Sequence, residues 1–293
     1  MTLRTLLTGM ILFVFLSAAG GTAQAAATDA NQIGQVHFPT SCSAEAQVHF
    51  DHAVALLHSF WFPEASKAFH TVLETDSSCA MGYWGIAVSL LGNPLAAAPT
   101  PQALQEGASI LREAKPVGVQ TEREYEYLSA IALCYKDVES TDHRTRGLAY
   151  EQAMERLAAR YPDDTEAAIF YALALISTAP PTDKTYVNQL KAAAILEKIF
   201  AQQPRHPGVA HYLIHSYDYP PIAAKGLAAA RSYARMAPAV PHALHMPSHI
   251  FTRLGFWQES IATNRASATA AKEELHATPT AGAGSSTALH ALD

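Results

Sequence analysis

The chain has 293 residues, of which 49% are hydrophobic and 16% are charged, and its formal net charge is −6 at pH 7. This acidic balance, without any cluster of Lys and Arg, excludes nucleic acid as an expected partner. A single compact core rarely extends over such a length, whereas a repeat array can, because each of its units packs only on its neighbours.

Residues 1–25 have the pattern of an export signal. Arg4 is their only charge, the apolar run LLTGMILFVFLSAA follows, and Ala23-Gln24-Ala25 fits a cleavage site. The run is shorter than the roughly 20 residues that a bilayer span needs, so an uncleaved anchor is the less favoured alternative. We expect an exported protein, periplasmic or secreted, without a membrane span after cleavage.

The remaining chain reads as all-α, with a lead-in segment at 26–45 and a helical repeat array over 46–293. It is rich in Ala, and breaks rich in Pro or Asp separate its amphipathic runs. The first unit spans about 46–79, with the small residues Ala53 and Ala65 where its two helices approach each other. Residues 95–160 hold at least two helices whose repeat register is not fixed.

The repeat period comes from three prolines, each of which lies shortly before a predicted helix. Pro162, Pro204 and Pro238 are separated by 42 and 34 residues. Thirty-four residues is the period of the tetratricopeptide repeat, a helix–turn–helix unit. This predicts repeats at 207–240 and 241–274, and a unit at 165–206 with a loop insertion around TAPPTDK.

The chain resembles a family of exported bacterial tetratricopeptide-repeat (TPR) proteins. The matching stretches are LLHSFWFPEASKAF, CAMGYWGIA, AYEQAMERLAARYPDDTEAAIFYALAL and HPGVAHYLIHSYD with PHALHMPSHIFTRLGFWQES. The resemblance implies repeats stacked in a right-handed superhelix and carries over no particular activity. TALHALD at 287–293 looks like the start of another helix, which leaves open whether the array continues beyond this sequence.

Histidines follow the same period. His211 and His245 differ by 34 residues, as do His215 and His249. They take positions 5 and 9 of the first helix in adjacent repeats, which face the concave groove in TPR folds, and His242 takes position 2. Packed helices lie about 8–10 Å apart, so imidazoles from both could share an ion at Zn–N distances of about 2.0–2.1 Å. We predict a transition-metal site, for Zn or Cu, drawn from His211, His215, His245, His249, His206, His242 and Asp218.

Two other interpretations of these residues remain open. One is a polar groove that binds a peptide, a protein or a small anionic ligand, with Thr252 at position 12 and His58 and Arg253 at position 13 of their helices. The other is structural hydrogen bonding alone, and Pro247 could place His245 at a helix end. The metalloprotease pattern H-E-x-x-H and a nucleophile elbow are both lacking, so catalysis is left undecided.

The three cysteines divide into a pair and a single thiol. Cys42 and Cys79 lie at the same end of neighbouring predicted helices, and we predict that they form a disulfide in an oxidising compartment, with two unpaired thiols as the alternative. Cys134 lies inside an apolar helix and is expected to be a buried free thiol.

Overall fold

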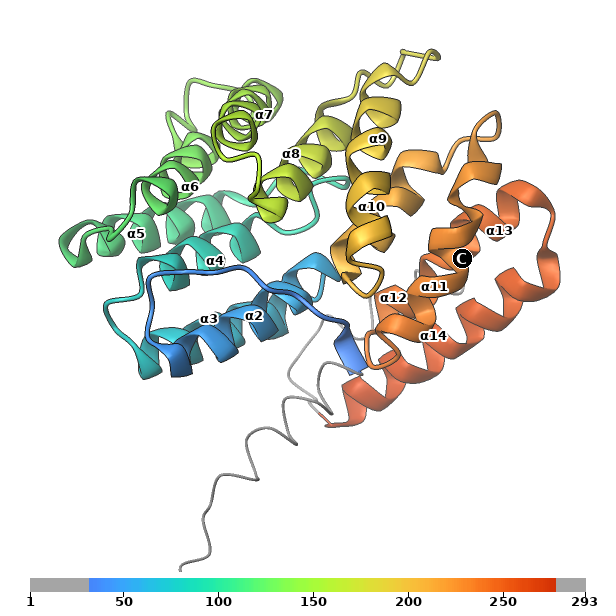
Figure 1. Ribbon diagram of the computed structural model, residues 1–293, viewed down its shortest axis with the longest axis horizontal. Coiled ribbons are helices and arrows are strands. Elements are labelled where there is room, and N and C mark those ends of the chain that lie inside the picture. Colours follow the sequence, from blue (N-terminus) through green and yellow to red (C-terminus); the bar gives the residue numbers. More distant parts are fainter. Residues whose placement is uncertain (1–31, 278–293) are drawn as a thin grey trace, which may run out of the picture.

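The computed structural model describes residues 32–277, and this range contains helices and no strand (Figure 1). The prediction of an all-α helical repeat fold is confirmed. The predicted signal at 1–25 and the segment 287–293 lie outside the described residues.

The helices follow one another as an arched array in which each packs mainly on its neighbours in the chain. The first part contains α2 (Ala44–His58), α3 (Phe62–Thr75), α4 (Ala80–Leu91), α5 (Pro101–Val117), α6 (Glu122–Ala132), η1 (Leu133–Tyr135), α7 (His143–Arg160) and α8 (Thr165–Thr178). The second part contains α9 (Val187–Gln202), α10 (Pro207–Tyr217), η2 (Ala223–Gly226), α11 (Leu227–Met236), α12 (Pro241–His245), α13 (Pro247–Leu254) and α14 (Trp257–Ala277).

The units expected from the sequence correspond to helix pairs. Helices α2 and α3 form the first, and Ala53 and Ala65 are fully buried where these two helices approach. Helices α8 and α9 form another, separated by the loop 179–186 that carries most of the predicted insertion. Segment 95–160 contains α5, α6, η1 and α7, so it holds more than the two helices expected as a minimum.

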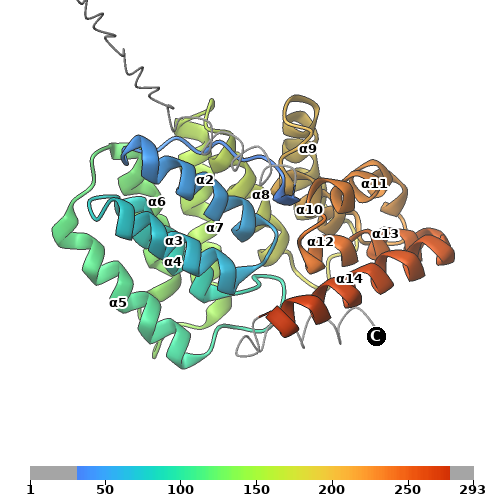
Figure 2. The same ribbon diagram turned by 90° about the horizontal axis from the view of Figure 1, so that it is seen from below.

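The last predicted repeat differs from a plain helix pair, because its first helix is interrupted. Helix α12 ends at His245 and α13 begins at Pro247, which occupies the first position of that helix. Proline has no backbone N–H and therefore cannot continue the hydrogen bonds of α12. The long helix α14 then packs along both short helices (Figure 2).

The array also closes on itself, since α2 contacts α10. The close approach requires a glycine: a Cβ on Gly208 would lie 2.5 Å from Nδ1 of His58. The lead-in segment strengthens this closure, because the N–H of Gln35 donates to the carbonyl of Arg205 (2.9 Å) and the N–H of Ala239 donates to that of Gln32 (3.1 Å). The lead-in segment thus contacts the chain both shortly before α10 and shortly after α11.

A disulfide joins Cys42 and Cys79, with Cα atoms 4.8 Å apart. It ties the segment before α2 to the start of α4, across the first helix pair. Cys134 is a free thiol, and burial raises its pKa to about 12. Within residues 32–277, no helix is long and apolar enough to cross a membrane.

Candidate metal centre

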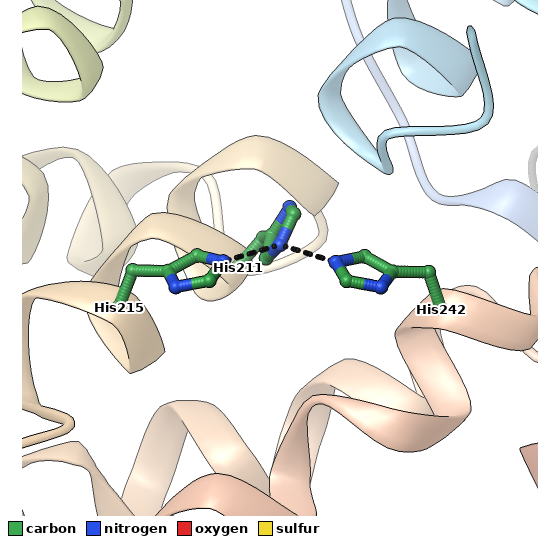
Figure 3. Close-up of side chains that lie close together, drawn as sticks. All are labelled: His211, His215 and His242. Carbon is green, nitrogen blue, oxygen red and sulfur yellow. Dashed lines mark hydrogen bonds between the residues drawn. The ribbon is translucent and has the colours of Figure 1, made fainter. Parts of the chain in front are cut away.

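Three imidazoles converge where α10 meets the start of α12. Nε2 of His211 lies 3.1 Å from Nε2 of His215 and 3.1 Å from Nε2 of His242. One nitrogen from each ring lies within 4.8 Å of the other two. His215 and His242 approach His211 from opposite sides (Figure 3). Ligands of a tetrahedral zinc ion at about 2.05 Å are roughly 3.3 Å apart. Nε2 of His211 already lies near that distance from both neighbours, whereas His215 and His242 would have to turn towards each other to share one ion with it.

Local helix geometry places these side chains. His211 and His215 are four residues apart on α10 and therefore lie on one helix face. His242 lies in the first turn of α12, immediately after Pro241. His211 is fully buried, whereas His215 and His242 are partly buried.

The hydrogen atoms of His211 can be assigned from its partners. Its Nδ1 lies 2.7 Å from the carbonyl oxygen of His58, which can only accept, so Nδ1–H is the donor. Burial, with the nearby His215 and His242, holds the pKa of His211 well below 6.5, so the ring is neutral. A neutral imidazole has one hydrogen, and Nε2 of His211 therefore carries a lone pair that faces the other two rings.

That lone pair can accept a good hydrogen bond from only one of its two neighbours. Burial, together with His249 and His245, lowers the pKa of His215 to about 3, so this ring is neutral as well. A bound cation would resolve the crowding, because it would accept a lone pair from each of the three Nε2 atoms. The arrangement suits a metal with three histidine ligands and an open fourth position.

Aromatic rings enclose the cluster. Tyr233 stacks on His211 with centroids 5.2 Å apart, and the edge contact of Phe60 with His211 has centroids 4.4 Å apart. Phe60 also stacks on His242 at 5.6 Å and on His215 at 6.0 Å. Its backbone has φ of 56°, which is uncommon for a bulky residue and typical of functional sites. The apolar shell limits access of water to the three nitrogens.

A second pair of imidazoles continues the cluster. Nε2 of His245 lies 3.0 Å from Nε2 of His249, and the rings of His249 and His215 have centroids 6.1 Å apart. Nδ1–H of His249 donates to Asp218 at 2.8 Å, and Nδ1 of His245 lies 2.8 Å from Oδ1 of Asn264. Asp218 therefore orients an imidazole.

Asp218 is also held by Arg253, whose Nε–H donates to its other oxygen at 2.9 Å. Burial would raise the pKa of Asp218, but the hydrogen bonds from His249 and Arg253 outweigh it and lower the pKa below 3.8. Thr252 bonds to Ser260 of α14 at 2.9 Å. Arg253 and Thr252 are thus engaged within the protein.

His206 and His58 lie in a separate buried cluster. Oε1 of Glu166 accepts from Nε2–H of His206 at 2.8 Å, and Oε2 accepts from Nε2–H of His58 at 2.9 Å. The remaining nitrogen of each ring accepts a hydrogen: from the N–H of Val209 for His206, and from the hydroxyl of Tyr212 for His58.

Every nitrogen of the two rings in this second cluster has a hydrogen-bond partner within the protein, and the ligand atoms of His58, Glu166 and His206 also lie close enough together to hold a metal ion. Burial would raise the pKa of Glu166, but the adjacent His206 and His58 lower it to about 2, so the carboxylate is ionised. The sequence predicts His206 as a ligand of the same metal site as His211, but the two histidines lie in different clusters. The structure makes His206 the cap of α10 and turns its ring towards α8.

Sequence reasoning missed two residues of this region. Glu166 lies in the first turn of α8, where an acidic residue reads as a favourable partner of the helix dipole. Phe60 lies in the turn after α2, and the sequence does not show which helix it contacts. Only the closure of α2 on α10 reveals what either residue does.

Comparisons with known proteins add little to this description. No family model matches the chain, and no curated protein matches it. Among solved structures, one match is the crystal structure of YrrB, described as a TPR protein with an unusual peptide-binding site. The match covers 78% of this chain and 98% of that one, with 17% sequence identity and a TM-score of 0.34. At that level of similarity it supports no conclusion about binding.

Proposed function

We propose that the protein is an exported helical-repeat protein that binds a transition metal, zinc or copper, through His211, His215 and His242. The observation that carries the proposal is the meeting of three Nε2 atoms around a lone pair of His211 that faces two other rings. Imidazole nitrogen is a common ligand of both metals. His249, His245 and Asp218 border the site and would shape its outer side.

Export is supported by two features. The pattern of residues 1–25 is that of a signal peptide, and the Cys42–Cys79 disulfide suits an oxidising compartment. The periplasm or the exterior of the cell is therefore the proposed location.

The alternative function, a scaffold with a polar groove for a peptide, stays a prediction. Its three proposed contact residues are already engaged: His58 with Glu166, Thr252 with Ser260, and Arg253 with Asp218. The geometry therefore favours the metal over the groove.

Metal content and competition titration test the proposal. Tag-free protein should carry or take up one equivalent of Zn²⁺ or Cu²⁺. His242→Gln and His215→Gln should each weaken binding by more than the roughly 10–100-fold that losing an outer-shell partner costs. Circular dichroism would verify that both variants keep their helices.

Two control variants locate the site. His70→Gln removes an exposed histidine on α3, and Glu113→Gln removes an exposed carboxylate on α5. Both should keep the metal affinity. Absence of stoichiometric binding, or unchanged affinity in His242→Gln and His215→Gln, would refute the proposal.

A further inference from the structure

An apolar cavity lies between α4, α7 and α8, and none of its lining residues is one of the clustered histidines. Its volume is about 260 Å³, and its walls include Val88 and Leu91 of α4 and Phe170 and Leu173 of α8. This is larger than the engineered apolar cavity of about 150 Å³ that binds benzene. It has room for roughly nine non-hydrogen atoms at about 30 Å³ each.

The cavity lining carries positive charge and no negative charge. Arg144 at the start of α7 belongs to the lining, together with Asn93 and Ser177, and no acidic side chain does. Arg144 is exposed and makes no ion pair with any residue in the described range 32–277. An apolar cavity with an unpaired guanidinium in its lining complements an amphiphile with an anionic head.

We propose that this cavity binds a medium-chain monocarboxylate, with its alkyl chain among the apolar walls and its carboxylate on Arg144. A guanidinium pairs with a planar carboxylate through two parallel hydrogen bonds. One cation balances one negative charge, whereas a phosphate monoester would bring nearly two. The number of atoms that the cavity holds corresponds to an acid of about eight carbons.

The proposal does not depend on the metal centre. Phe60 lines the cavity and also covers the histidine rings, but none of the clustered histidines borders the cavity. The ligand would therefore contact Phe60 and none of the clustered imidazoles.

Gly147 of α7 provides a way to fill the cavity. A Cβ at this lining position would meet only Cγ2 of Thr178, at the ordinary contact distance of 3.7 Å. Gly147→Leu therefore places its extra carbons in the cavity, while Gly147→Ala adds one carbon without a clash. Comparing the two variants distinguishes the effect of filling the cavity from the effect of replacing the glycine.

Isothermal titration with octanoate and with 1-octanol tests the proposal. Octanoate should bind the purified protein about fivefold more tightly than octanol, which is the worth of a solvent-exposed ion pair. Arg144→Gln should remove that difference and leave the octanol affinity unchanged. Gly147→Leu should abolish binding of both, and Gly147→Ala should retain it.

Arg156→Gln is the matched control for charge, since Arg156 is exposed on the same helix but does not border the cavity. It should bind octanoate as the parent protein does. Failure of octanoate to bind, equal affinities for the acid and the alcohol, or unchanged binding in Gly147→Leu would each overturn the proposal. Metal titration of the same samples is read separately, so that either hypothesis can fail alone.

Discussion

Glu166 shows what a single residue contributes to this fold. Its carboxylate is buried and ionised, and it accepts hydrogen bonds from His58 of α2 and His206 of α10. The Glu166 side chain of α8 thus links α2 and α10 by hydrogen bonds at the place where the array closes. An ionised group in such a position stabilises the folded state only as long as it keeps its charge.

Glu166→Gln should lower the free energy of unfolding at pH 7 by about 3 kcal/mol, because a neutral amide cannot accept from both rings. The folded pKa is lowered from 4.5 to about 2, which corresponds to a linkage of similar size. The parent protein is therefore more stable than Glu166→Gln above pH 4.5. This difference in the free energy of unfolding is lost as the pH falls towards 2. Urea unfolding of the parent and the variant at pH 7 and at pH 3 measures the difference in the free energy of unfolding at each pH.

Glu113→Gln is the control, because Glu113 is exposed on α5. It should unfold like the parent protein at both pH values. A Glu166→Gln variant as stable as the parent at pH 7 would show that the carboxylate is not needed for closure.

The period of the sequence predicted which histidines lie on facing positions, but not their partners. The spacing of four residues places His211 and His215 on one face of α10, and the 34-residue period relates them to His245 and His249. Neither pattern contains information about Glu166, which comes from a different unit and lies in the first turn of α8. Partners across non-adjacent units depend on the curvature of the array, and repeat spacing does not report curvature.

Helices α7 and α10 each carry a glycine, and the surroundings of the two differ. A Cβ on Gly147 in α7 would have room, with its nearest contact at 3.7 Å, whereas one on Gly208 in α10 would meet His58 at 2.5 Å. Alanine favours a helix over glycine by about 1 kcal/mol in both cases. Packing therefore decides whether Gly208→Ala stabilises or destabilises the fold, and helix propensity decides this for Gly147→Ala.

Gly147→Ala should raise the free energy of unfolding by about 0.5–1 kcal/mol. Gly208→Ala should lower it by about 1–3 kcal/mol, since the overpacked ring of His58 has to move. Chemical denaturation of the two variants beside the parent measures the difference. Stabilisation by Gly208→Ala would show that α2 and α10 are not in close contact.

The interruption between α12 and α13 is the element that sequence reasoning located only in part. Pro247 indicates that His245 could lie at a helix cap, whereas the structure makes His245 the last residue of α12 and Met246 the cap of α13. The packing of both halves on α14 follows from tertiary contacts, which a proline does not specify. The local signal of Pro247 thus indicated a helix boundary near His245, and the split into two short helices is known only from the structure.

For the whole molecule, the Cys42–Cys79 disulfide restrains the first helix pair. It spans 37 residues and joins the lead-in segment to α4. In the chain-entropy model a loop of this length stabilises the fold by roughly 4 kcal/mol. Reduction should therefore loosen the terminal unit, which has a chain neighbour on one side only.

Thiol titration tests this bond. The unreduced protein should show one reactive thiol when denatured, from Cys134, and almost none when native, because burial raises the pKa of that thiol to about 12. Reduction before denaturation should reveal all three cysteines and lower the melting temperature. Three reactive thiols in the denatured, unreduced protein would contradict the bridge.

The hydrogen bond from His211 to the carbonyl of His58 connects residues 153 positions apart. In a chain made from its N-terminus, α2 is complete long before α10 exists, and such distant contacts are slow to form. The tautomer that exposes the lone pair of His211 is therefore fixed only when the first helix pair has docked. Metal uptake would then follow closure of the arch, so that an incompletely folded chain would not retain the ion.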